Sequence, residues 1–132
     1  MASTLKINTL TGVTTAGSIA VTGEGNSTTT NLQQGLAKGW VQFDTGDNPP
    51  VADGSFNCSS VADTATGQPT ITLTNFMANT NFSHTYGGIS HMNVGALESR
   101  FSASVIGLRT RASNDSDTDL DHSTATIHGD LA

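Results

Sequence analysis

The stretch Pro69-Thr-Ile-Thr-Leu-Thr-Asn-Phe76 alternates cleanly between polar and apolar side chains. Ile71 and Leu73 fall on one face of an extended backbone, and the threonines between them fall on the other. This period of two is typical of a half-buried β-strand, because successive side chains of a strand point to opposite faces. Residues 69–76 are therefore predicted to form a strand whose Ile71 and Leu73 point into a core.

Similar short segments lie on both sides of this strand. We expect further strands at residues 39–44, 55–61, 82–87, 101–111 and 124–131. Turn formers separate them, most clearly Thr-Gly-Asp-Asn-Pro-Pro at 45–50. Within 55–61, Phe56 and Cys58 are expected to point inward. Short strands at short intervals with no helix between them predict an all-β fold, a small antiparallel sandwich or barrel.

The one stretch with helical spacing is residues 31–38, where Leu32 and Leu36 stand four positions apart. Asn31 is an acceptable N-cap and Gly39 an acceptable terminator, whereas Gly35 weakens the helix. We expect one short helical turn there, directly before the strand that begins with Trp40.

Residues 1–31 have few apolar side chains. These are Leu5, Ile7, Leu10, Val13, Ile19 and Val21. Leu5/Ile7 and Ile19/Val21 fit short strands, but so few apolar groups cannot offset the ordering entropy of the segment. We therefore predict an extended docking arm at 1–31, held by identical copies or by a larger partner, and a β-rich domain at 32–132.

The overall composition narrows the possible functions. Of the 132 residues only 12% are charged, against about 25% in an average domain. Such a surface tolerates burial against neighbouring subunits. The formal net charge is −6 and only five lysines and arginines are present, too few for a nucleic-acid footprint.

Cellular location is constrained by three further features. Cys58 is the single cysteine, so no intrachain disulfide forms. The first residues lack the basic and apolar regions of a signal peptide, and no apolar run approaches the roughly 18 residues of a membrane span. We expect a chain that is kept soluble in a cytoplasm or leaves the cell by a route other than secretion.

A resemblance to a known class rests on four segments of the chain. They are Asn31-Leu-Gln-Gln-Gly-Leu-Ala-Lys-Gly-Trp-Val-Gln-Phe-Asp44, Asp53-Gly-Ser-Phe-Asn-Cys-Ser-Ser-Val-Ala-Asp63, Ile71-Thr-Leu-Thr-Asn-Phe76 and the closing Gly129-Asp-Leu131. Together they resemble a domain of structural proteins of tailed phages, especially short-tailed phages of marine and cyanobacterial hosts. The resemblance covers residues 31–132, and Leu5-Lys-Ile-Asn-Thr-Leu10 is similar to the start of fibre-like proteins.

The resemblance implies a homotrimer displayed on the virion, assembled in the host cytoplasm, with other virion structural proteins as partners. One departure matters. Long fibres carry an N-terminal anchoring domain and a long shaft, whereas this chain has only the arm at 1–31.

An acidic stretch, Asn114-Asp-Ser-Asp-Thr-Asp-Leu-Asp121, is the densest candidate for a metal site. Asp115, Asp117 and Asp119 match the start of a calcium loop. Leu120 stands where the loop needs its glycine, and Thr126 where it needs a bidentate glutamate. We expect a solvated acidic loop without a bound metal, although trimer symmetry could still bring three such loops together over a cation.

No pattern points to catalysis. The four histidines, His84, His91, His122 and His128, form no local pair with metal-ligand spacing. Nucleophile-elbow, phosphate-loop and metalloprotease motifs are lacking, so we expect neither an enzyme nor a bound cofactor. Trp40, Phe43 and Tyr86 are core aromatics or a sugar-stacking platform, and Trp40 and Phe43 are expected in the core.

Two functions remain open. In the first, the protein is a virion surface structural protein, a trimeric head decoration or short fibre. Its expected assembly residues are Leu5, Ile7, Leu10, Ile19, Val21, Leu32, Leu36 and Trp40. Trp40 is expected to pack under the junction of arm and β domain. In the second, it is a receptor-binding tip whose loops at 44–54, 77–81 and 112–122 contact a glycan of the host surface.

Overall fold

The computed structural model describes residues 4–12, 19–22, 29–47, 49–88 and 93–132. Two compact units make up the chain, Met1–Leu36 and Ala37–Ala132. The division lies after Leu36, so the helical turn belongs to the N-terminal unit.

Within its described residues, the N-terminal unit contains two short strands and one helical turn. β1 (Ala20–Thr22) pairs antiparallel with β2 (Thr29–Asn31), and α1 (Leu32–Gly35) follows directly. The helix predicted over 31–38 is thus too long, because Ala37 already belongs to the next strand. Gly35 is a poor helix former, and Ala37 gains strand pairing opposite His128. Within residues 4–12 the strand expected at Leu5 and Ile7 is not formed.

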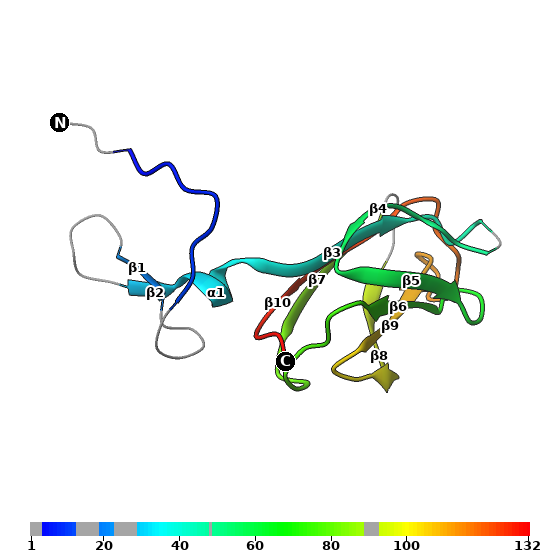
Figure 1. Cartoon of the computed structure of the whole chain (residues 1–132). Coiled ribbons are helices and arrows are strands. Elements are labelled where there is room, and N and C mark those ends of the chain that lie inside the picture. The colour runs from blue at the N-terminus through cyan, green and yellow to red at the C-terminus, as the bar shows by residue number, and fades with distance from the viewer. Residues whose placement is uncertain (1–3, 13–18, 23–28, 48, 89–92) are drawn as a thin grey trace. The chain divides into compact units, whose positions relative to one another are not determined.

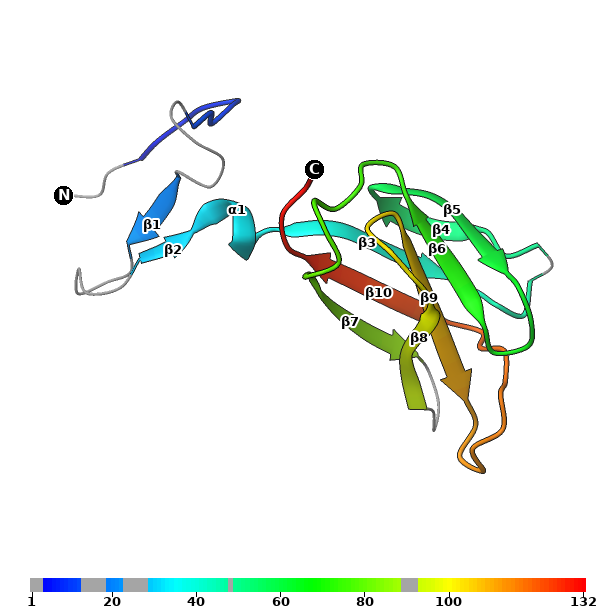
Figure 2. The ribbon, with the colours of Figure 1, turned by 90° about the horizontal axis from the view of Figure 1, so that it is seen from below.

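The unit Ala37–Ala132 is a β-sandwich of two antiparallel four-stranded sheets (Figure 1). Its strands are β3 (Ala37–Phe43), β4 (Ala52–Phe56), β5 (Cys58–Asp63), β6 (Pro69–Leu73), β7 (Ser83–Gly88), β8 (Asn93–Phe101), β9 (Val105–Arg111) and β10 (Ser123–His128). One sheet has the order β4-β3-β10-β7 and the other β5-β6-β9-β8. Figure 2 shows β10 between β3 and β7. The predicted all-β antiparallel sandwich is confirmed.

The core lies between the two sheets and follows the alternation along each strand. Ile71 and Leu73 of β6 are buried, as predicted, while Thr70 and Thr72, which alternate with them, are partly exposed. The other buried apolar side chains of this cluster are Val41, Phe43, Met77, Ile106, Leu108, Ala125 and Ile127. Each large one stabilises the fold by roughly 1.5–3 kcal/mol relative to an exposed position, so the sandwich has a core of its own.

Residues 55–61 do not form the single strand that the sequence predicts. The chain turns at Asn57, whose φ is +56°, and passes from β4 in one sheet to β5 in the other. The Asn57 Nδ2 donates to the carbonyl oxygens of Lys38 at 2.8 Å and Asn75 at 3.0 Å, and the Asn75 amide donates to Asn57 Oδ1 at 2.6 Å. Phe56 consequently lies outside the core, 53% exposed, rather than inward.

The strand predicted over 101–111 is in fact the turn and second strand of a hairpin. β8 ends at Phe101 and β9 begins at Val105. The Ser102 amide donates to the Val105 carbonyl at 2.8 Å, and the Ser102 hydroxyl accepts from the Val105 amide at 3.0 Å. Side-chain hydrogen bonds of this kind favour turns over strands. Phe101 and Val105 therefore stand on different strands.

Candidate functional site

The acidic loop is solvent-exposed at residues 113–116, and its carboxylates also form ion pairs within the chain. Arg109 donates two hydrogen bonds to the Asp117 carboxylate, at 2.9 and 3.1 Å, and Arg111 pairs with Asp115 at 2.6 Å. The Asp119 carboxylate accepts a hydrogen bond from the Gly67 amide at 2.7 Å. The three carboxylates predicted as calcium ligands thus bind cations and an amide of their own chain.

These contacts tie the loop to strand β9. The hydrogen bond from Arg109 is the main reason why the pKa of Asp117 lies below its usual value. Thr110 of β9 also donates its hydroxyl to the Thr118 carbonyl at 2.6 Å. In the described part of the chain, no three His, Cys, Asp or Glu side chains gather in a way that could hold a metal.

The four histidines do not form one site. His84 lies among aromatic rings, His128 is in β10, and His122 is exposed just before β10. His91 lies outside the described residues.

The apolar side chains of the N-terminal unit are largely in solvent. Leu5 is 78% exposed, and Ile7, Leu10, Val21 and Leu36 are each at least half exposed. Ile19 and Leu32 are partly exposed. Single exposed apolar residues are normal, but here most of the apolar content of one unit lacks a core. These are the residues that the sequence predicts as assembly contacts.

Trp40 lies on the outer face of the sheet β4-β3-β10-β7. It is 44% exposed, and its cross-strand partner Phe56 on β4 is also exposed. A Cβ atom on Gly54 would lie 3.5 Å from two atoms of the Trp40 ring, so the indole covers this glycine at van der Waals distance. Gln42 and Thr126 occupy neighbouring positions on the same face. The predicted burial of Trp40 is therefore wrong within the sandwich, whereas that of Phe43 is right.

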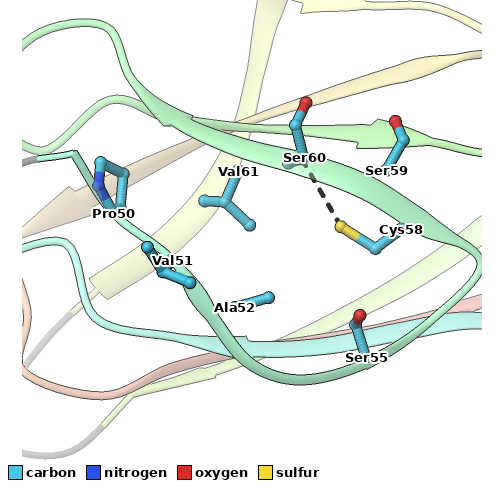
Figure 3. Close-up of a pocket in the computed structure, with 8 residues that line it drawn as sticks. All are labelled: Pro50, Val51, Ala52, Ser55, Cys58, Ser59, Ser60 and Val61. Carbon is cyan, nitrogen blue, oxygen red and sulfur yellow. Dashed lines mark hydrogen bonds between the residues drawn. The ribbon is translucent and has the colours of Figure 1, made fainter.

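A pocket of about 310 Å³ opens between the edge strands β4 and β5 (Figure 3). Its lining residues are Pro50, Val51, Ala52 and Ser55 on one side and Cys58, Ser59, Ser60 and Val61 on the other. Burial raises the pKa of the Cys58 thiol, which donates to the Ser60 carbonyl at 3.5 Å. A raised pKa makes a poor nucleophile, so the pocket is a shaped apolar and hydroxyl-lined surface rather than a reactive centre.

Large aromatic side chains close the opposite side of the sandwich, between β7 and β8. The Phe82 and Phe101 rings stack with centroids 4.9 Å apart, and His84 packs against Phe101 at 5.1 Å and Tyr86 at 4.8 Å. Burial raises the pKa of Tyr86, and its hydroxyl has no hydrogen-bond partner among the described residues. Tyr86 thus belongs to the packing of this edge, not to an exposed platform.

No family model, curated protein or solved structure matches this chain. Among the residues that the structure describes, no helix is long and apolar enough to cross a membrane.

Sequence reasoning missed both the β4/β5 pocket and the exposed Trp40–Phe56 pair. The asparagine after Phe56 was the available signal, because asparagine tolerates the left-handed conformation that a chain reversal requires.

Proposed function

We propose that the protein is a non-enzymatic structural subunit of a virion surface, a homotrimeric head decoration or short fibre docked by its N-terminal arm. The observation that carries this proposal is the exposure of Leu5, Ile7 and Leu10 in a segment that forms no strand of its own. Apolar side chains in such a segment stabilise a structure only when a second surface covers them. The trimeric state and the virion come from the resemblance of residues 31–132.

The sandwich supports a scaffolding role because its buried core forms without residues of the arm. Its buried apolar cluster draws every member from the unit Ala37–Ala132. Deleting residues 2–30 should therefore leave a folded β domain that no longer assembles or joins particles.

The test compares the full-length chain, the deletion and a variant with Leu5, Ile7 and Leu10 all changed to serine. Analytical ultracentrifugation at micromolar concentration measures the oligomer, and copy number on purified particles measures incorporation. We expect a trimer for the full-length chain and a monomer for both variants, with circular dichroism unchanged in the sandwich. A stable full-length monomer, or normal incorporation of the deletion, contradicts the proposal.

The Trp40–Phe56 pair supports a second candidate function, recognition of a glycan on the host surface. A sheet face with an exposed indole gives an apolar surface for the C–H face of a sugar ring, and the nearby Gln42 and Thr126 offer amide and hydroxyl groups. This candidate places the contact on the sheet face rather than on the loops at 44–54, 77–81 and 112–122.

The second candidate is tested with Trp40→Ala, using Phe76→Ala as the matched control. Phe76 is a large apolar residue with an exposure of 53%, similar to that of Trp40, but it lies outside the sheet face. Loss of binding to host cells or to host glycans in Trp40→Ala alone, with an unchanged melting temperature and oligomer, is expected for a glycan contact. If Trp40→Ala binds host cells and host glycans as well as Phe76→Ala does, Trp40 is not a glycan contact.

A further inference from the structure

The two open sides of the sandwich are closed very differently. Between β7 and β8, the rings of Phe82, His84, Tyr86 and Phe101 fill the space between the sheets. Between β4 and β5 the corresponding side chains are small, among them Ala52, Ser55 and Cys58, and a space of about 310 Å³ remains. That volume is at the lower end of the roughly 300–1,000 Å³ of ligand pockets. This side of the sandwich is therefore open in the single subunit.

The same side also presents two strand edges that have no partner among the described residues. There, β4 pairs only with β3, and β5 pairs only with β6. Edge strands leave a row of backbone N–H and C=O groups that another extended chain can bind. β4 and β5 carry two acidic residues, the exposed Asp53 and Asp63, and no basic one.

Residues 4–12 have the complementary properties. Leu5 and Ile7 alternate with Lys6 and Asn8, so a strand formed here would present two apolar side chains on one face. Lys6 is the only charged residue of the segment, and its sign is opposite to that of Asp53 and Asp63. Nine extended residues span about 30 Å, longer than the about 20 Å of β5.

We propose that residues 4–12 of a neighbouring copy add as a strand along β5, with Leu5 and Ile7 inserted into the β4/β5 pocket. This inference rests on the proposed assembly function and names the surface that receives the arm. Backbone hydrogen bonds to the edge provide the attachment, and the pocket selects the register of the two apolar side chains. The arm of one subunit thereby covers the open side of the sandwich of the next.

The native Cys58 makes the proposal directly testable. It lines the pocket and is the only cysteine of the chain, so a single new cysteine in the arm reports where the arm lies. A disulfide forms only if the two Cα atoms come within about 7 Å. In full-length protein under mild oxidation, Ile7→Cys is expected to give disulfide-linked oligomers on non-reducing gels.

Asn8→Cys is the matched control, because position 8 faces away from the pocket in the proposed strand. Ile7→Cys should form linked oligomers roughly ten-fold faster than Asn8→Cys, since only the former lies within disulfide reach. The double variant Ile7→Cys/Cys58→Ser has a cysteine only in the arm and reports links between two arms. The wild-type chain has only Cys58 and reports links between two pockets. Both proteins are expected to form no disulfide-linked oligomers.

The outcomes separate this inference from the function on which it rests. A trimer in sedimentation whose Ile7→Cys form gives no link to Cys58 overturns the pocket assignment and leaves arm-mediated assembly standing. A link within one chain, seen as a faster-migrating monomer, likewise overturns the exchange between copies. A full-length chain that sediments as a monomer overturns both.

Discussion

Asn57 forms the corner at which the chain changes sheets, and its replacement by alanine should destabilise the sandwich substantially. The side chain takes part in three hydrogen bonds, with the main chain of Lys38 and Asn75, at 2.6–3.0 Å. At this partly solvent-exposed site their combined loss amounts to about 1–2 kcal/mol, at the low end of about 0.5–1.5 kcal/mol per bond. Asparagine is one of the few residues with a Cβ that adopt φ +56° readily, whereas alanine at this position adds about 1–2 kcal/mol of backbone strain.

Asn57→Ala should therefore lower the free energy of unfolding by about 2–4 kcal/mol. Asn57→Gly loses the same hydrogen bonds without the strain and should lower it by about 1–2 kcal/mol. For a unit of this size each kcal/mol shifts the melting temperature by about 4–8 °C, so the alanine variant should melt about 10 °C or more below wild type.

Urea denaturation followed by circular dichroism and by the fluorescence of Trp40, the only tryptophan, measures these differences. Asn75→Ala is the control, because Asn75 contributes only main-chain atoms to the three hydrogen bonds. Its stability should stay near wild type. Equal stability of Asn57→Ala and Asn57→Gly would refute the strain argument. Wild-type stability of both variants would show that the Asn57 hydrogen bonds do not stabilise the sandwich.

Three further predictions concern ionisable groups. The pKa of Asp117 is lowered chiefly by Arg109, so its stabilising effect is present above about pH 4 and is lost as the pH falls; Asp117→Asn should flatten the acid side of a plot of urea midpoint against pH. The pKa of Tyr86 is raised by burial, so stability is kept below about pH 10 and decreases as the pH rises further; Tyr86→Phe should remove that alkaline decrease in the same assay. Because Asp115, Asp117 and Asp119 are engaged within the chain, calcium or a chelator should leave the melting temperature unchanged in differential scanning calorimetry, and a shift of many degrees would contradict this.

Local patterns were sufficient to predict the class of fold. The alternation of Ile71 and Leu73 with threonines indicates a strand with one buried face, and that information is contained in adjacent residues. The scarcity of apolar residues before Asn31 likewise indicates a segment without a core. Both inferences depend only on counting and spacing side chains along the chain.

Contacts between distant residues decided the rest. Asn57 becomes a corner because Lys38 and Asn75 meet its side chain, far away in sequence, and Phe56 is then turned to the surface beside Trp40. A period of two describes a strand equally well whether it stays in one sheet or crosses to the other.

The state of the acidic loop depends on long-range geometry in the same way. Its carboxylates resemble calcium ligands in order and spacing, but the Gly67 amide, 52 positions away in sequence, reaches Asp119 only after β6 and β9 have paired. The β4/β5 pocket also exists only in three dimensions, because small side chains on two different sheets leave it unfilled. The spacing of residues along the chain does not predict such a pocket, because it depends on how side chains pack when the two sheets come together.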